Sequence, residues 1–354
     1  MTQRRPDTGR TTIPAAGTAA DRSTQPAGNG TAHGKVILLG EHAVVYGAPA
    51  LALPIPELGC RARVVRQARS EPEAVSYRFL QTPAGIPSGP FPSPATSPQE
   101  TAPEGIHDLI RAVLREAFGG GAPGVDVTLE SGVPPARGLG SSAACARALT
   151  HALAGFAGLR LSADEVFRYV QVSENAAHGR ASGIDALATG SRRPVLLDRG
   201  RATTPPVGAD GWVVVADSGS GASTKDAVTM LSDGFAQAAG SRERFLERSA
   251  TLTREGLRHL ERGDLAALGG VFTACHELLA GLGLTTARTD ALARAALEAG
   301  ALGAKMSGGG LGGCVIALTA TGQAAGAVAA LLLREQGALC WVTPLTRGEG
   351  HDGI

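Results

Sequence analysis

Apolar and polar residues follow two different periods along this chain, which predicts a mixture of strands and helices. Lys35–Leu39 and Trp212–Ala216 are short apolar runs that predict buried strands. Val125–Leu129 alternates apolar with polar residues, as a strand with one buried face does. Gly105–Phe118 has apolar residues at helical spacing, and the alanine-rich segment Ser141–Phe156 predicts another helix. Both kinds of element are therefore expected.

Capping residues indicate further helices. Ser162 and Glu165 have the spacing of a capping box, so a helix is expected to begin there and to run to about His178. Two or three more helices are expected within residues 225–282. The rest of the chain predicts a helix capped by Asp290 and ending at Gly300, followed by a strand, a helix and a last strand, at Val315–Leu318, Ala324–Glu335 and Leu339–Thr343.

Strands and helices do not alternate strictly, so the order of elements predicts an α+β fold in two lobes rather than a doubly wound sheet. Residues 1–30 are rich in Thr, Ala, Gly, Pro and Arg without a period, which is typical of a disordered leader. Residues 81–103 are dense in Pro, Ser and Gly and predict a long loop. The composition of residues 1–30 and 81–103 does not indicate a role for either segment. The expected organisation is a leader, an N-terminal lobe, a C-terminal lobe and a tail, at residues 1–30, 31–211, 212–347 and 348–354.

Composition narrows the class of protein. With 354 residues, of which 43% are hydrophobic and 18% charged, the chain can bury a sizeable core. A net charge of +1 provides no basic field for nucleic acid or for an acidic membrane. No apolar run reaches the roughly 18 residues of a spanning helix, and no apolar segment of a secretory signal follows Arg4 and Arg5. A globular protein without a nucleic-acid or membrane partner is expected.

Cysteine and lysine usage add two constraints. The five cysteines are odd in number, dispersed and without a CxxC pair, which argues against a disulfide framework or a zinc site and favours the cytoplasm. Only three of the 33 basic residues are lysines, namely Lys35, Lys225 and Lys305. A chain so poor in lysine is expected to keep it where a compact ammonium group is needed.

The segment Pro134–Ala144 is a candidate phosphate-binding loop. It follows a predicted strand and opens a predicted helix, where free N–H groups and the positive end of the helix dipole suit an anion. Its glycines allow close approach of the backbone, and Ser141 and Ser142 add hydroxyl groups. It lacks the G-K-[ST] of a Walker A loop. The alternative is a glycine turn in which a serine caps the helix.

Two other blocks are candidates for the same site. Lys35–Gly47 places Lys35 on a strand and Glu41 and His42 just beyond its end, either to bind a polar substrate or as a structural pair. Ser307–Gly313 has five glycines in seven positions and runs directly into an apolar strand. A flexible linker has a similar composition, but the strand favours a loop packed against another backbone or a ligand.

The segment from Glu174 to Asp185 contains two carboxylates of interest. Glu174 falls at the end of a predicted helix and Asp185 in the loop beyond, so a reversal within Gly179–Gly183 would bring them together. Phosphoryl transfer uses one acid to hold Mg²⁺ and another to orient or deprotonate the attacking hydroxyl group. Glu174 and His178 also have the i, i+4 spacing of metal ligands, although no third ligand is evident nearby.

Taken in order, the blocks Lys35–Gly47, Pro134–Ala144 and Lys305–Cys314 resemble the three signature motifs of the GHMP kinases, and the resemblance extends from residue 32 to about 343. It implies ATP-dependent transfer of a phosphoryl group to a hydroxyl group. It also implies an N-terminal lobe like domain 2 of ribosomal protein S5, a ferredoxin-like C-terminal lobe, and a site between them.

The resemblance implies roles for single residues. Asp185 corresponds to the catalytic base, and Lys35 to the lysine that pairs with it and stabilises the transferred phosphoryl group. Ser142 and Glu174 correspond to the ligands of Mg²⁺. Residues that correspond to the ATP site are Pro134, Gly138, Leu139, Gly140, Ser141, Ser142 and Ala143. Residues that correspond to the acceptor site are Glu41, His42, Asp185, Thr224, Gly309 and Gly310.

Within the family, Gly40–Gly47 resembles the mevalonate kinase form, as does the His178–Asp185 run, although Arg180-Ala181 replaces the more usual pair ending in proline. This implies (R)-mevalonate as acceptor, phosphorylated at its 5-hydroxyl group. The alternatives are another small-molecule kinase of the family, acting on phosphomevalonate, on the 3-hydroxyl of mevalonate or on a sugar, and a non-catalytic relative that binds a metabolite. Oligomeric state, with a homodimer as one option, and feedback inhibition by isoprenoid diphosphates are left open.

Overall fold

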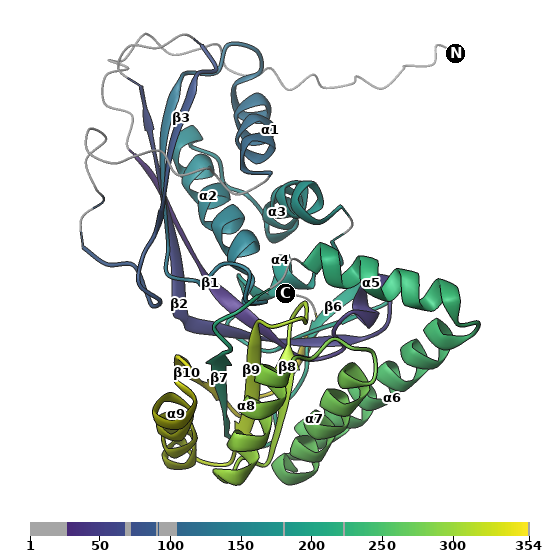
Figure 1. Ribbon diagram of the computed structural model, residues 1–354. Coiled ribbons are helices and arrows are strands. Elements are labelled where there is room, and N and C mark those ends of the chain that lie inside the picture. The colour runs from purple at the N-terminus through teal and green to yellow at the C-terminus, as the bar shows by residue number, and fades with distance from the viewer. Residues whose placement is uncertain are drawn as a thin grey trace, which may run out of the picture.

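The computed structural model describes residues 27–67, 72–89, 91, 105–179, 181–221 and 224–352, without the side chains of His178, Thr224 and Asp352. Two β-sheets form two lobes, each covered by helices (Figure 1). Residues 1–26 of the expected leader and residues 92–103 of the expected loop lie outside the described residues. The first strand begins at Gly28, inside the range expected as a leader.

The N-terminal lobe is built on a seven-stranded sheet. Its strands are β1 (Gly28–Leu39), β2 (Ala50–Arg66), β3 (Val75–Gln81), β4 (Val125–Ser131), β5 (Val195–Asp198), β6 (Arg201–Thr204) and β11 (His351–Asp352). The order is β11-β6-β5-β2-β4-β3, with β1 paired to β2, and all pairs are antiparallel except β3 with β4. β11 comes from the segment expected as a tail and pairs with β6. The long strand β2 therefore joins β1, β4 and β5 into one sheet.

Helices cover one face of this sheet (Figure 1). They are α1 (Ile106–Phe118), α2 (Ser141–Ala157) and α3 (Ala163–His178), followed by the short α4 (Ile184–Ala188). A 3-10 turn, η2 (Ala43–Tyr46), lies earlier in the chain, between β1 and β2. α2 packs against β1 and β2 and is apolar on most of its surface because α1 and α3 enclose it from outside. α3 begins with the expected capping box of Ser162 and Glu165.

The C-terminal lobe is built on a four-stranded antiparallel sheet of order β10-β7-β9-β8. Its strands are β7 (Gly211–Asp217), β8 (Gly303–Ser307), β9 (Cys314–Thr319) and β10 (Cys340–Leu345), and its helices are α5 (Thr224–Gln237), α6 (Ser241–Arg262), α7 (Leu265–Ala280), α8 (Ala287–Glu298) and α9 (Gly322–Gln336). Along β7, Val213 and Val215 pack into one core cluster, and Val214 and Ala216 into another that contains α8 and α9. This alternation is what a sheet buried on both faces requires.

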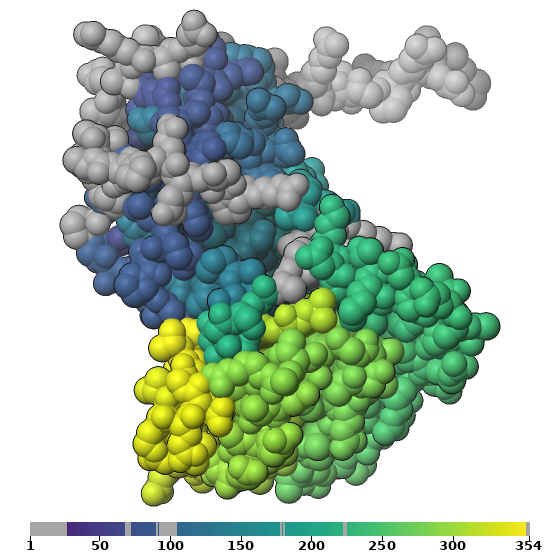
Figure 2. Space-filling view, viewed as in Figure 1, coloured from purple at the N-terminus to yellow at the C-terminus, as the bar shows by residue number. Residues whose placement is uncertain are grey.

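The two lobes share one hydrophobic core. A single buried cluster contains Leu38 and Leu51 from the N-terminal sheet together with Leu268 and Ile316 from the C-terminal lobe. In Figure 2 the N-terminal lobe (purple to teal) stands directly on the C-terminal lobe (green to yellow). In the described part of the chain, none of the helices combines the length and apolar character that a membrane-spanning segment needs.

Two local expectations were wrong. Asp290 does not cap α8, because Thr286 accepts the capping hydrogen bond from the backbone of Thr289 and Asp290 lies within the first turn. Asp185 does not lie in a loop, since it is the second residue of the short helix α4. The first error concerns which of two polar residues captures the free N–H groups at a helix start, while α4 is a short helix without a side-chain cap that would mark its start.

Strand β1 lies so close to α2 that it has no room for a side chain at Gly30. A Cβ atom there would stand 2.0 Å from the carbonyl oxygen of Ala148 and 2.7 Å from the backbone nitrogen of Ala152. The backbone of α2 cannot yield as a flexible side chain would.

Gly30→Ala is therefore expected to lower the free energy of unfolding by about 3 kcal/mol, because strand and helix must separate. Thr31→Ala is the matched control, since the neighbouring Thr31 is exposed and its truncation should change stability by less than about 0.5 kcal/mol. Urea titrations of both variants measure the difference. Equal stability of the two variants would contradict the close packing described for β1.

Candidate active site

The active site is assembled on the open edge of β1, the edge that does not face β2. Backbone N–H groups on this edge must find partners elsewhere. Three different segments provide them: His33 N donates to Thr189 O (3.4 Å), Lys35 N to Leu139 O (2.9 Å) and Ile37 N to Ser307 Oγ (3.0 Å). The end of α4, the 134–140 loop and strand β8 are thereby gathered around Lys35.

Lys35 and Asp185 form an ion pair at the centre of this arrangement. Lys35 Nζ lies 2.9 Å from Asp185 Oδ1, and it also donates a hydrogen bond to Gly138 O at 3.1 Å. The lysine side chain is 3% exposed and that of Asp185 34%, so the carboxylate is open to a ligand while the ammonium is held from behind. A proton acceptor beside a fixed positive charge suits a hydroxyl group that becomes a nucleophile.

Glu174 and Ser142 are the candidate metal ligands. Burial and, second, the nearby charge of Asp185 raise the pKa of Glu174 to about 7, against the opposing effects of the Ser142 hydroxyl and Lys35. A divalent cation would remove this penalty by pairing with the ionised carboxylate. A carboxylate and a hydroxyl oxygen are the hard donors that Mg²⁺ prefers, and Mg²⁺ commonly completes its shell with substrate phosphates and water.

Within the described residues, no group of three or more His, Cys, Asp or Glu side chains could hold a metal ion. A self-sufficient site is therefore not formed among those residues, and the side chain of His178, with its alternative pairing to Glu174, lies outside them. The donor set fits a cation that is shared with phosphate oxygens.

The candidate phosphate loop joins the two lobes. Gly138 and Gly308 approach so closely that a Cβ on Gly138 would lie 2.9 Å from the Cα of Gly308. Gly140 stands at the N-cap of α2 with φ 72°, and no described side chain caps that helix. The first-turn N–H groups are thus left for an anion. The Ser141 hydroxyl donates to Val133 O at 3.1 Å and holds the loop onto the strand before it.

A cavity of about 330 Å³ lies between the lobes and is lined by seven of the fifteen expected residues, with Pro134, Gly140, Ser141 and Ser142 not among them. From the expected catalytic, metal and acceptor sites it is lined by Lys35, Glu41, His42, Glu174, Asp185 and Gly309, and from the phosphate loop by Gly138. Its size suits a small molecule. Gly310 is not among the lining residues and packs against Leu284, while Leu139 and Ala143 are buried in the core. Thr224 is the first residue of α5, and its side chain lies outside the described residues.

Glu41 and His42 take different roles. Glu41 is buried and forms an ion pair with Lys305. Glu41 thus has a structural contact, but its partner is Lys305 and not His42. His42 lines the cavity with φ 60°, and burial lowers its pKa to about 4, so the imidazole is neutral at pH 7. Among the described residues, none offers a hydrogen-bond partner to His42 Nε2. His42 therefore contributes a neutral imidazole to the wall of the cavity.

The sequence interpretation missed several lining residues, among them Lys225, Thr229 and Tyr46. Lys225 carried a signal, as one of only three lysines in the chain. Tyr46 lies within the candidate block Lys35–Gly47, whereas Thr229 carried no signal, because an isolated polar residue on a helix is common on any surface.

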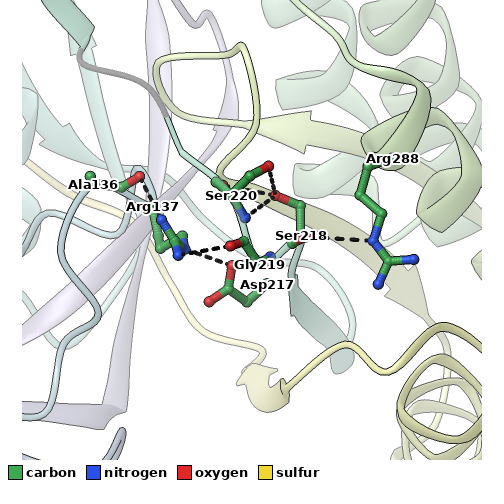
Figure 3. Close-up of polar contacts among 7 residues, drawn as sticks. All are labelled: Ala136, Arg137, Asp217, Ser218, Gly219, Ser220 and Arg288. Atoms are coloured by element: carbon green, nitrogen blue, oxygen red, sulfur yellow. Dashed lines mark hydrogen bonds and ion pairs between the residues drawn. The ribbon is translucent and has the colours of Figure 1, made fainter.

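Polar contacts between the lobes fix the rear of the phosphate loop (Figure 3). Arg137 Nε lies 2.8 Å from Asp217 Oδ1, and Arg137 donates to Gly219 O at 3.2 Å. Gly219 belongs to the loop that follows β7. This loop is held by Ser218, which donates to Ser220 O at 2.9 Å, and by Arg288 of α8, which donates to Ser218 O at 3.5 Å. The loop after β7 is thus bonded both to the candidate phosphate loop and to α8.

The buried His42 makes stability depend on pH. The unfolded chain takes up a proton at this residue near pH 6.5 and the folded chain only near pH 4, so acid favours the unfolded state within that window. Between pH 7 and pH 5 the loss amounts to about 2 kcal/mol. His42→Asn, in which asparagine tolerates a positive φ, should lose that much less stability over the same interval. Urea titrations at both pH values test this, and an unchanged pH dependence would contradict a buried neutral histidine.

Comparisons with known proteins agree with this geometry. A family model described as GHMP kinases N terminal domain matches residues 106–191, and one described as GHMP kinases C terminal matches residues 254–338. A mevalonate kinase of Aeropyrum pernix is 34% identical over 304 residues, which are 84% of this chain and 90% of that relative. A mevalonate kinase of Pyrococcus furiosus is 30% identical over 90% of this chain and 96% of its own length.

Solved structures show the same fold. The match to L. major mevalonate kinase in complex with R-mevalonate has a TM-score of 0.73 at 25% identity and covers 91% of this chain and 97% of that one. Lactococcus lactis galactokinase complexed with galactose matches with a TM-score of 0.71 at 19% identity, over 93% and 96% of the two chains, and shows the fold alone. The family expected from the three glycine-rich blocks is therefore confirmed, and the chain belongs to the GHMP kinases, in the group that contains the mevalonate kinases.

Proposed function

We propose that this protein is a mevalonate kinase, which transfers the γ-phosphoryl group of ATP to the 5-hydroxyl group of (R)-mevalonate. The observation that carries the proposal is the single cavity onto which the Lys35–Asp185 ion pair, Glu174 and Gly138 of the phosphate loop all open. The sequence relatives named mevalonate kinases, and the structural neighbour solved with R-mevalonate, support the choice of acceptor.

The residues suit direct phosphoryl transfer by positioning and charge. Asp185 accepts the proton of the acceptor hydroxyl group, and Lys35 Nζ, 2.9 Å from it, offsets negative charge that develops as the phosphoryl group moves. The N–H groups at the start of α2 hold the phosphates. Mg²⁺, held by Ser142 and Glu174, would neutralise charge on the phosphate oxygens.

The lining of the cavity favours a carboxylate-bearing alcohol without a phosphate. Lys225 lines the cavity and offers a second ammonium group, which suits an acceptor carboxylate, while Ile37, Val44 and Ile184 form an apolar wall for a methyl-bearing carbon chain. No arginine is found among the described residues that line the cavity. A phosphorylated acceptor would meet fewer cations than its charge requires, so phosphomevalonate is the less suitable substrate.

We also propose a reducing compartment, the cytoplasm, because all five cysteines carry free thiols. The partners proposed are the two substrates alone, in keeping with the net charge of +1. Self-association as a homodimer stays a prediction, which light scattering of the purified protein tests.

Purified protein with Mg-ATP should release ADP in the presence of (R)-mevalonate and not with phosphomevalonate or galactose. A coupled assay of ADP release across the three acceptors measures this. Turnover with phosphomevalonate or galactose and none with mevalonate would refute the proposed acceptor and leave the phosphoryl transfer standing.

Asp185→Asn should lower kcat by roughly 10²–10⁴-fold, because the amide cannot accept the hydroxyl proton and no longer pairs with Lys35. Nucleotide affinity, measured with a fluorescent ATP analogue, should stay within about twofold, since Asp185 faces the acceptor side of the cavity. Asp233→Asn, at an exposed position of α5, is the matched control and should keep full activity. An active Asp185→Asn enzyme would exclude Asp185 as the base.

A further inference from the structure

Strand β8 is fully buried, yet two of its five residues are polar. Lys305 is 0% exposed and Ser307 1%. Because side chains alternate along a strand, these two residues point to the same face. Neither lines the cavity, so neither is accounted for by contact with a substrate.

Both polar side chains reach across to the N-terminal lobe. Lys305 Nζ forms an ion pair with Glu41 and donates to Met306 O at 2.8 Å. The hydroxyl of Ser307 accepts a hydrogen bond from Ile37 N at 3.0 Å and donates one to Ile37 O at 2.9 Å. Ser307 thus completes the backbone of β1 as a neighbouring strand would.

The two contacts fall inside the stretch from Lys35 to His42, close to its two ends. Ile37 is two residues beyond Lys35, and Glu41 directly precedes His42. Near Ile37 the pairing of β1 with β2 shifts register, between Ile37 and Leu39. At this irregularity the sheet alone does not fix the strand, and the contacts from β8 do.

The buried ion pair between Lys305 and Glu41 joins the two lobes at a high desolvation cost. Burial raises the pKa of Glu41, and Lys305 opposes the shift by stabilising the carboxylate. Removing two charges from water costs several kcal/mol, so a buried ion pair adds less stability than an apolar contact of equal size. The ion pair contributes orientation more than stability, because an ammonium group and a carboxylate fix one geometry.

We propose that Lys305 and Ser307 are positioning residues for phosphoryl transfer. Together they attach the Lys35–His42 segment to the C-terminal lobe, and so set where Lys35 meets Asp185 and where His42 faces the cavity. The inference rests on the proposed phosphoryl transfer for its kinetic consequence, and on the contacts alone for its structural one.

Ser307→Ala is the primary variant, because it removes one hydroxyl group and leaves no charge unpaired. It should lower kcat by about tenfold or more, since small displacements of a reacting group are costly, with nucleotide affinity within about twofold of the original. Ser307→Thr, which keeps the hydroxyl group, should recover most of the activity. Thr319→Val is the matched control, as it removes a buried hydroxyl group from β9 of the same sheet and should leave kcat unchanged.

A double-mutant cycle separates positioning from general destabilisation. If Ser307 acts through Lys35, Ser307→Ala should have little further effect on kcat in the Lys35→Met enzyme, whereas a structural effect would persist in full. Lys305→Met with Glu41→Gln removes both charges at nearly constant volume, and this double variant should fold and lose activity. An additive cycle, or full activity of the neutral double variant, would overturn the proposal.

Hydrogen exchange gives a readout that does not depend on the substrate. Amide exchange of the segment 33–42 should quicken in Ser307→Ala and not in Thr319→Val. Unchanged exchange would overturn the attachment of this segment by Ser307 whatever the acceptor is. If the original enzyme shows no turnover with mevalonate, the proposed acceptor is wrong. The kcat values of the variants are then measured with the acceptor that the enzyme does use.

Discussion

The open edge of β1 is the constraint on which the site depends. A buried strand edge cannot leave its N–H groups without partners. Here the partners are the end of α4, the phosphate loop and β8, bonded in turn to His33, Lys35 and Ile37. The hydrogen bonds of these three amides therefore bring the proposed base, the proposed phosphate-binding helix and the second lobe to one place. The shared hydrophobic core supplies the driving force for this assembly, and the edge supplies its geometry.

Charge in the cavity is arranged in pairs. Lys35 lies against Asp185, and Lys305 against Glu41 behind the cavity wall, while burial and, second, the charge of Asp185 raise the pKa of Glu174 to about 7. Phosphate groups with a divalent cation would offset the cost of ionising this buried carboxylate. Such a site favours a charged, cation-bearing nucleotide over a neutral ligand, because each bound charge relieves a cost that already exists.

Local sequence features predicted what depends on neighbouring residues. The glycine-rich blocks, the capping box at Ser162 and the short apolar strands all follow from residues a few positions apart. Strand β2 was missed because Pro54 and Pro56 argue against a strand, and a register shift in its pairing with β1 absorbs residues 56–58. The ion pairs Arg137–Asp217 and Lys305–Glu41, and the contact of Ser307 with Ile37, join residues far apart in the chain. No local pattern contains that information.

The cavity is proposed to orient ATP and acceptor for direct transfer, without a phosphorylated side chain in between. The stereochemistry at the transferred phosphorus distinguishes the two routes. The probe is ATP made chiral at the γ-phosphorus by replacing one oxygen with sulfur and labelling another with an oxygen isotope. One in-line displacement inverts the configuration, so the product should show inversion. Retention would require two displacements and a phosphorylated residue such as Asp185, and would contradict the role of that carboxylate as proton acceptor.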